Sequence, residues 1–290
     1  MENLLAVVQD GSLIDPHGAD VVVPWWSYTK TIMAAAALVL ASDQRLALDE
    51  PLRERPYTLR QLLQHRAGVS SYGGLAAYHE AVARDDEPWP VAELLKRTQA
   101  ERLLYPPGKG WAYSNIGYLF VRNLIEEACG EDLGVALTRL VLDPLGIAGA
   151  RMPRERADFA GAKMGVPSYH PGWVYHGLLI GPLGEAALLL DRLMSGVLLE
   201  PAWLDQMRDA LRLAGPVAGR PWRELGYGLG LMCGEATNGS KVIGHTGGGP
   251  GSVVAVYHLP REAQRLTAAS FAFGEDPLPV EEAVFGRATR

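Results

Sequence analysis

SYTKTIMAAAALVLASD, residues 27–43, joins a short polar start to a long apolar continuation. The stretch contains neither Gly nor Pro and is apolar nearly all round from Ile32 onward, which predicts a helix that is covered on every side. A spacing of three residues places the side chains of Ser27 and Lys30 on one face of such a helix. The stretch therefore predicts a central buried helix that begins with a serine and a lysine in contact.

The residues before this helix predict a small amount of β-structure. Leu4–Gln9 and Val21–Val23 are β-branched and apolar runs, and Asp10-Gly11-Ser12 between them is a turn signal. We expect the two runs to form a hairpin-like pair.

The chain after the central helix is predicted to be mainly helical from about residue 45 to about residue 215. The expected helices are Thr58–Gln64, Val91–Thr98, Gly117–Ala128, Gly134–Val141, Gly184–Ser195 and Pro201–Leu211. Four strand-like runs follow, Gly226–Cys233, Lys241–His245, Ser252–Leu259 and Leu266–Phe273. Polar or Gly-rich turns separate these runs, so they should pair as an antiparallel sheet.

Strands at both ends of the chain, with helices between them, predict an α/β fold of the α+β type. One antiparallel sheet would be built from both chain termini and flanked by helices, with a mainly helical subdomain inserted. We expect a single domain over residues 1–290, with a sheet subdomain of about 1–45 and 216–290 and a helical subdomain of about 46–215. A cleft would lie where the two subdomains meet.

The composition excludes several classes of protein. A chain of 290 residues with 48% hydrophobic and 21% charged residues is globular, and its net charge of −6 with scattered Lys and Arg argues against nucleic acid as a partner. The longest apolar run, Ile32–Ala41, is about half of the roughly 20 residues that cross a bilayer. Met1–Leu5 lacks the basic start of a secretory signal. We expect a cytoplasmic protein with no membrane partner.

The cysteines and histidines predict neither a disulfide framework nor a metal site. Cys129 and Cys233 are far apart in sequence and have no ligand spacing, and the seven histidines include no H-E-x-x-H pair. No metal and no organic cofactor is expected.

Two segments carry groups that are suited to acyl transfer. At a helix start, the N–H of Ser27 could form half of an oxyanion hole, and burial should lower the pKa of Lys30, as a general base requires. Tyr113-Ser114-Asn115 lies at a predicted junction of a loop and a helix. The phenol of Tyr113 beside a lysine ammonium should have a reduced pKa and could pass a proton, and Asn115 offers an amide donor and an acceptor.

A third segment, His245–Gly251, ends one predicted strand and turns into the next. Its glycines would let a substrate lie against the strand edge, and the N–H of Gly248 could be the second oxyanion donor. Each segment alone also has an ordinary structural interpretation: a capping serine with an extended lysine, a capped helix with a packed tyrosine, and a Gly-rich hairpin.

Together and in this order, Ser-Tyr-Thr-Lys at 27–30, Tyr-Ser-Asn at 113–115 and His-Thr-Gly at 245–247 resemble three motifs of the serine β-lactamase and penicillin-binding superfamily. Leu59–Gly68 and Tyr105–Tyr118 resemble segments of one branch of that superfamily. The branch contains class C β-lactamases, D-alanyl-D-alanine carboxypeptidases, D-aminopeptidases and family VIII carboxylesterases.

The resemblance implies a β-lactamase/transpeptidase-like fold and a serine hydrolase. In that family pattern Ser27 is acylated, while Lys30 and Tyr113 handle its proton. The implied substrate-binding residues are Asn115, His245, Thr246, Gly247 and Gly248. The family's C-terminal helix is expected to be short or missing after Phe285, so a partner subunit in a homo-oligomer could cover that face of the sheet.

His245 stands where penicillin-hydrolysing members carry a lysine. An imidazole is only partly charged near neutral pH, so it should anchor a substrate carboxylate more weakly. We expect an acyl-Ser27 intermediate on a small-molecule ester or small amide, with carboxylesterase favoured over amidase or D-peptidase, and β-lactamase last. An acyltransferase using the same site, and a non-catalytic ligand-binding or sensor module, are the alternatives.

The loop Gly161–Gly181 is the part of the site about which the sequence says least. Trp173, Tyr175 and His176 within it could form a substrate wall, although packing is the favoured interpretation.

Overall fold

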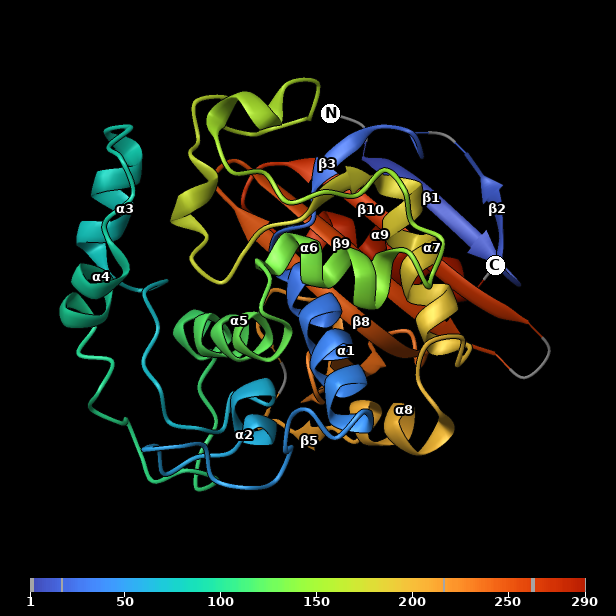
Figure 1. Cartoon of the computed structure of the whole chain (residues 1–290). Coiled ribbons are helices and arrows are strands. Elements are labelled where there is room, and N and C mark those ends of the chain that lie inside the picture. The colour runs from blue at the N-terminus through green and yellow to red at the C-terminus, as the bar shows by residue number, and fades with distance from the viewer. Residues whose placement is uncertain (1–2, 17, 216, 262–263, 290) are drawn as a thin grey trace.

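The computed structural model describes residues 3–16, 18–215, 217–261 and 264–289 (Figure 1). Its centre is an eight-stranded sheet with strand order β2-β1-β10-β9-β8-β7-β6-β5, in which all neighbours are antiparallel. The strands are β1 (Leu4–Gln9), β2 (Ser12–Asp15), β5 (Leu211–Arg212), β6 (Trp222–Tyr227), β7 (Met232–Ala236), β8 (Lys241–Gly249), β9 (Ser252–Pro260) and β10 (Arg265–Phe273). Because β1 pairs with β10, the predicted antiparallel sheet from both ends of the chain is confirmed.

The partner of β1 in the first hairpin is β2, so the predicted pairing of β1 with Val21–Val23 is wrong. Asp10 and Gly11 have φ angles of 49° and 83°, the left-handed pair that a two-residue hairpin loop requires. The chain therefore folds back at once. Val22–Pro24 instead forms β3, which pairs with β4 (Ile180–Pro182) in a separate two-stranded sheet.

The predicted single strand Gly226–Cys233 is in fact the end of β6, a turn and the start of β7. Gly230 in this turn has a φ of 69°, and a Cβ there would lie 2.5 Å from Cβ of Ala34 and 2.8 Å from the backbone O of Lys30. The turn thus packs directly on the helix that carries Lys30, and only glycine fits at its tip.

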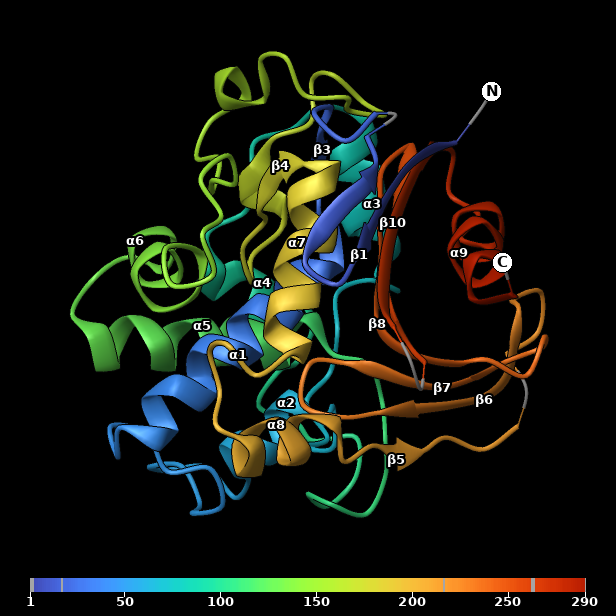
Figure 2. The ribbon, with the colours of Figure 1, turned by 90° about the vertical axis from the view of Figure 1, so that its right-hand side faces the viewer.

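Helices cover both faces of the large sheet. Figure 2 shows the sheet on edge, with α9 (Leu278–Phe285) on one side and α1 (Thr29–Ser42) and α7 (Leu183–Met194) on the other. The other helices are α2 (Leu59–Leu63), α3 (Ala76–Ala83), α4 (Val91–Arg97), α5 (Asn115–Cys129), α6 (Leu133–Leu137) and α8 (Pro201–Arg208). Shorter helical turns are η1 (Trp26–Tyr28), η2 (Thr138–Leu142), η3 (Arg156–Phe159), η4 (Pro171–Trp173) and η5 (Gly286–Thr289).

The C-terminal helix is present as α9, and it packs on β9 and β10. Helix α7 falls in the range assigned to the helical subdomain, yet it packs on β1, β9 and β10, because its apolar side is buried against the sheet. The predicted helix Pro201–Leu211 is shorter, since Leu211 already belongs to β5. Pro216, where the predicted subdomain boundary falls, lies outside the described residues.

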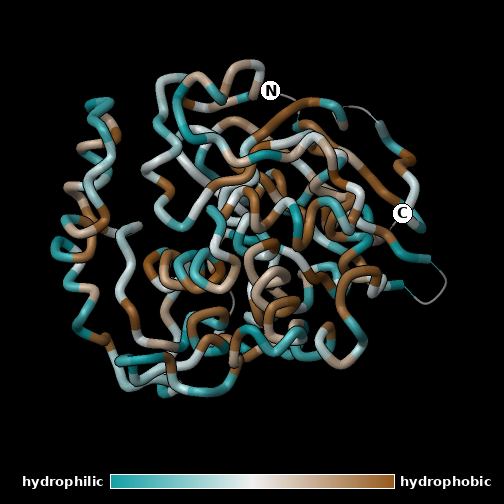
Figure 3. The backbone as a smooth tube through the Cα atoms, viewed as in Figure 1, coloured by the Kyte–Doolittle hydropathy of each residue, from teal (hydrophilic) through white to brown (hydrophobic). Residues whose placement is uncertain are grey.

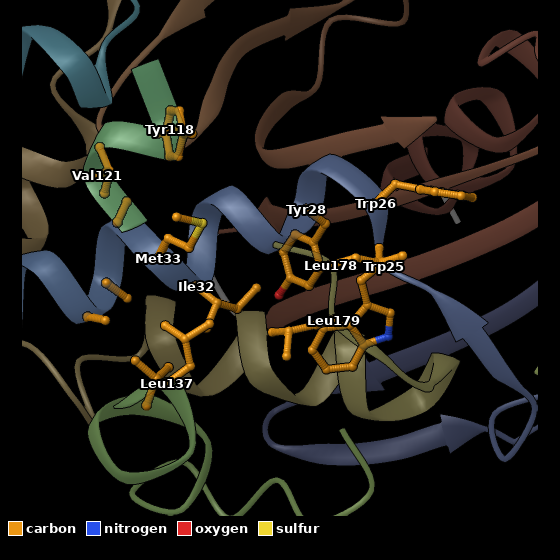
Figure 4. Close-up of a cluster of buried hydrophobic side chains, with 14 of the residues drawn as sticks. Trp25, Trp26, Tyr28, Ile32, Met33, Tyr118, Val121, Leu137, Leu178 and Leu179 are labelled. Atoms are coloured by element: carbon orange, nitrogen blue, oxygen red, sulfur yellow. The ribbon is translucent and has the colours of Figure 1, made fainter. Parts of the chain in front are cut away.

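Helix α1 is the predicted central helix, and nearly all of its residues are buried. In Figure 3 the hydrophobic colour follows the inner strands and helices, while the outer loops are mostly hydrophilic. Figure 4 shows Ile32 and Met33 of α1 among side chains of α5 and α6, and Tyr28 beside Leu178 and Leu179. Over the described ranges, the structure has no helix with both the length and the apolar character needed to cross a membrane.

Candidate active site

Ser27 lies in η1, immediately before α1. The preceding residue, Trp26, has a φ of 41°, a left-handed conformation that is unusual for a bulky side chain. The Trp26 ring is held in place, because its Nε1 donates a hydrogen bond of 3.1 Å to Ser252 Oγ and its edge meets Tyr169. Trp26 and Tyr28 are buried, whereas Ser27 remains partly exposed. The turn therefore places the partly exposed Ser27 between two buried side chains, those of Trp26 and Tyr28.

Lys30 is fully buried beneath Ser27, with its Nζ 3.1 Å from Ser27 Oγ. Its Nζ also lies 5.1 Å from the ring centre of Tyr113 and 5.6 Å from that of Tyr118. Burial lowers the pKa of Lys30 well below its usual value, and no carboxylate in the described part of the chain forms an ion pair with it to oppose this shift. The predicted contact and the predicted direction of the pKa shift are both present.

Tyr113 lines the pocket beside Ser27, and a hydrogen bond joins the two side chains. Burial raises the pKa of Tyr113 far above its usual value, so the predicted lowering of this pKa is wrong. The prediction assumed a neighbouring ammonium, but the buried amine of Lys30 itself favours the uncharged form. Tyr113 is therefore a protonated phenol, able to donate a hydrogen bond and to relay a proton.

The opposite wall is the open edge of β8. Strand β7 pairs with β8 only as far as Gly244, whereas β9 continues to Gly249, so residues 245–249 lack a strand partner on one side within the described sheet. The turn η1 lies against this edge. A Cβ on Gly247 would be 2.7 Å from Ser27 N and 2.8 Å from Trp25 O, which means that the strand touches the backbone of the serine turn.

Gly247→Ala is expected to lower kcat/KM by about 100-fold, because the added methyl group must push β8 away from Ser27, and a shift of about 1 Å can cost this much. Gly248→Ala is the matched control, since its Cβ would meet only Val253 Cγ1 at an ordinary 3.6 Å. We expect the kcat/KM of this control to fall by less than about tenfold. Steady-state kinetics on one substrate measures both variants, and equal losses would contradict the proposed role of the close contact.

His245 is buried on β8 and is held by two hydrogen bonds. Its Nε2 lies 2.9 Å from Tyr227 OH, and its Nδ1 lies 2.7 Å from the backbone O of Thr246. Burial lowers the pKa of His245 to about 3. The ring is therefore uncharged at neutral pH, and the predicted partial charge is wrong because the prediction took no account of burial.

Thr246 is supported from behind by a carboxylate that the sequence did not single out. Glu281 of α9 is fully buried, and its Oε1 accepts a hydrogen bond of 2.5 Å from Thr246 Oγ1. Arg220 forms a bidentate ion pair with Glu281, and Trp222 Nε1 donates to it at 3.3 Å. These partners satisfy the buried charge. The carboxylate of Glu281 in turn offsets the charge of Arg220, which lines the pocket.

A pocket of about 370 Å³ brings most of the predicted residues together. Its wall includes Ser27, Tyr113, His245, Thr246, Gly247 and Gly248. Much of the remaining wall is apolar, with Leu213, Leu225, Met232 and Val253. Among the described residues, no three His, Cys, Asp or Glu side chains are grouped in a way that would hold a metal ion.

Asn115 is set back from this wall, at the first turn of α5. Its backbone N–H donates a hydrogen bond of 3.2 Å to Ser71 Oγ. Its buried Oδ1 has no hydrogen-bond partner in the described part of the chain, so an acceptor is left available to a ligand.

His176 was considered in the sequence only as a substrate wall or a packing residue, and its contact with Lys30 was not predicted. Its Nε2 lies 2.8 Å from Lys30 Nζ, and its Nδ1 lies 3.4 Å from Tyr72 OH. Trp173 and Tyr175 instead turn their polar atoms to backbone oxygens of the segment 86–89 and do not line the pocket. No local motif marks His176, because its contact joins residues 146 positions apart.

Comparison with known proteins places the chain among serine hydrolases and their relatives. A profile of the family described as Beta-lactamase matches residues 4–260. A D-aminopeptidase from Cereibacter sphaeroides is 27% identical over 236 residues, which cover 77% of this chain and 44% of that protein. Esterase EstB from Burkholderia gladioli is 29% identical over 152 residues, which cover 46% of this chain and 38% of the esterase. The chain thus matches less than half the length of either relative.

A solved structure of a D-stereospecific amidohydrolase from Streptomyces sp. matches the chain with a TM-score of 0.77 and 25% sequence identity. The match covers 98% of this chain and 94% of that protein. The predicted fold class and the resemblance seen in the three motifs are both confirmed.

Proposed function

The chain belongs to the Beta-lactamase family, and from this membership we propose that it is a serine hydrolase that cleaves an ester or a small amide through an acyl-Ser27 intermediate. One observation carries the proposal: the buried amine of Lys30 lies 3.1 Å from a serine hydroxyl that opens into a pocket. An amine with a lowered pKa can accept the serine proton at neutral pH.

In the acylation step, Lys30 Nζ takes the proton of Ser27 while Oγ forms a bond to the carbonyl carbon of the substrate. The carbonyl oxygen becomes an oxyanion, which the backbone N–H groups of Ser27 and Gly248 would stabilise. The close contact between η1 and β8 supports this role, because it holds the two backbones on one side of the pocket.

The tetrahedral intermediate then collapses, and the bond from carbon to the alcohol oxygen or the amine nitrogen breaks. The leaving group takes up a proton from Lys30 by way of the Tyr113 hydroxyl, which is hydrogen-bonded to Ser27. A water molecule repeats the sequence on the acyl-enzyme and releases the acid. An alcohol or amine in place of water would give acyl transfer with the same residues.

The charges around the pocket argue against a substrate carboxylate as the main anchor. His245 is uncharged, and the ion pair with Glu281 offsets the charge of Arg220. The apolar side chains on the wall favour a substrate with an apolar group. We therefore place β-lactams last. The relatives carry the names of a peptidase, an amidohydrolase and an esterase, so the preference for esters over amides has no support. A cytoplasmic location and self-association stay predictions.

A fluorophosphonate probe followed by peptide mass mapping tests the nucleophile, and a substrate panel tests the class. The panel contains short p-nitrophenyl esters, p-nitroanilides of D- and L-amino acids, and nitrocefin. We expect a single adduct on Ser27. We also expect kcat/KM on an ester or an amide to be at least about tenfold above that on nitrocefin, because the uncharged His245 cannot make a charged contact with the carboxylate of a β-lactam, and the loss of one such contact costs this much or more. An adduct on another residue would refute Ser27 as the nucleophile, and neither label nor turnover would favour a non-catalytic binding module.

A further inference from the structure

His176 is held in place by the same turn that carries Ser27. The segment that follows it is fixed at Leu179, because Leu179 N donates a hydrogen bond of 3.0 Å to Thr29 Oγ1 and Trp25 N donates one of 2.8 Å to Leu179 O. Figure 4 shows Leu178 and Leu179 packed beside Trp25. His176 is itself only 3% exposed. Its contact with Lys30 therefore lies in the core, although His176 belongs to a loop.

We propose that His176 is a positioning residue for acylation, which accepts a hydrogen bond from Lys30 Nζ, aims the free electron pair of the amine at Ser27 and stabilises the ammonium that forms. This inference rests on the proposed function, since it assumes that Lys30 is the base. Nothing in the three motifs points to it.

The direction of the hydrogen bond decides whether His176 helps or blocks the lysine. A neutral amine has two N–H groups and one electron pair. If an N–H of Lys30 donates to Nε2 of His176, the electron pair stays free for the Ser27 proton. If Nε2 were protonated instead, it would occupy that electron pair and remove the base.

Tyr72 can accept the proton that the productive form of the imidazole carries on Nδ1. A productive His176 carries its proton on Nδ1, which lies 3.4 Å from Tyr72 OH. The Tyr72 oxygen also accepts a hydrogen bond from the backbone N–H of Tyr175. Burial raises the pKa of Tyr72, so its oxygen is a neutral phenol with a second electron pair for the His176 proton. Because Tyr72 OH could also donate to Nδ1, the tautomer is assigned from the role of Lys30 as the base.

His176 assists the reaction at the step in which Lys30 takes up the serine proton and becomes charged. Its ammonium would have no carboxylate partner in the described part of the chain, so Nε2 of His176 and the ring faces of Tyr113 and Tyr118 must stabilise it. A hydrogen bond to a charged donor is roughly twice as strong as a neutral one, so this bond strengthens as the proton moves. The other ionisable groups that act on Lys30 or His176 are His65, Arg122 and His245.

His176→Leu removes the acceptor and keeps an apolar side chain in the core. We expect kcat/KM to fall roughly 30- to 100-fold, mainly through kcat, because the lost interaction is made with the transition state. The acid limb of the pH profile of kcat/KM should move to lower pH by about one unit, since the ammonium of Lys30 becomes less stable. His176→Gln places an amide oxygen near the position of Nε2 and should restore part of both effects.

Two further variants separate positioning from packing. Tyr72→Phe keeps the ring and removes the hydroxyl, and we expect a smaller loss of about three- to tenfold with little change in melting temperature. His258→Gln alters another buried histidine, on β9, which bonds to Thr267 away from the pocket, and its kcat/KM should match that of the wild type. Circular dichroism reports whether each variant is folded. If His176→Leu unfolds, the kinetics of His176→Gln and Tyr72→Phe test the proposal instead.

Two results would overturn the proposed role of His176. The first is a wild-type kcat/KM in His176→Leu. The second is an equal loss of kcat/KM in His176→Leu and His176→Gln, with the acid limb of the pH profile unchanged. Both results assume that the fluorophosphonate probe labels Ser27 in the wild type. Absence of that label would instead refute the proposed function, so the two failures are distinct.

Discussion

Ser27→Ala is expected to lose the fluorophosphonate adduct completely and to lower kcat/KM by about five to six orders of magnitude. The variant removes one oxygen atom from a partly exposed side chain, so the fold should be retained. Thr246, the other aliphatic hydroxyl on the pocket wall, already bonds to Tyr257 and Glu281, so we do not expect it to replace the nucleophile. Intact mass after labelling and initial rates at high enzyme concentration measure the two effects.

Ser195→Ala is the matched control for this variant. Ser195 is exposed after α7, and its hydroxyl donates only to the backbone O of Arg192. It should keep the wild-type label and rate. An adduct on the Ser27→Ala chain, or a rate within about tenfold of the wild type, would show that another residue is the nucleophile.

Lys30→Met is expected to lower kcat/KM by about 10³- to 10⁴-fold and at the same time to raise the melting temperature. The activity falls because Ser27 loses its base. The stability rises because a buried amine without a carboxylate partner is replaced by an apolar side chain of similar length. Initial rates and thermal unfolding by circular dichroism, both at pH 7, measure the opposite changes.

The pH dependence gives Lys30→Met an independent check. Burial lowers the pKa of Lys30 in the folded chain, whereas the unfolded chain has a value of about 10.4. Between these two values the unfolded wild type binds a proton that the native protein does not bind, so the free energy of unfolding rises with pH across this window. The advantage of the Met variant should shrink as the pH approaches about 10.4. A variant less stable than the wild type throughout the window would contradict the assignment.

The parts of the fold that were predicted correctly depend on local patterns. Helix α1 follows from an apolar run without Gly or Pro, and its first turn fixes the spacing of Ser27 and Lys30. The first hairpin was misjudged although its turn was recognised. The true partner, Ser12–Asp15, is largely exposed and has its two apolar residues side by side without alternation, whereas the apolar Val21–Val23 looked more like a strand.

The parts of the site that were missed depend on contacts between distant segments. His176 reaches Lys30 across 146 positions, and Glu281 reaches Thr246 from the helix that the family pattern led us to expect to be short or missing. The pKa errors at Tyr113 and His245 have one cause: the first prediction considered a neighbouring ammonium and the second an ordinary imidazole, and neither considered the burial that dominates each group. Burial of a single side chain is a property of the assembled fold.

The open edge of β8 also limits what the molecule can pair with. Unpaired strand edges invite other chains to add a strand, and this is a common route to aggregation. Here the stretch without a strand partner on one side is only residues 245–249, three of which are Gly, and the Trp26 ring lies 2.5 Å from the position of a Cβ on Gly249. The unpaired stretch is therefore short and rich in glycine, and its end packs against Trp26, so it offers few free backbone groups with which a strand of another molecule could pair.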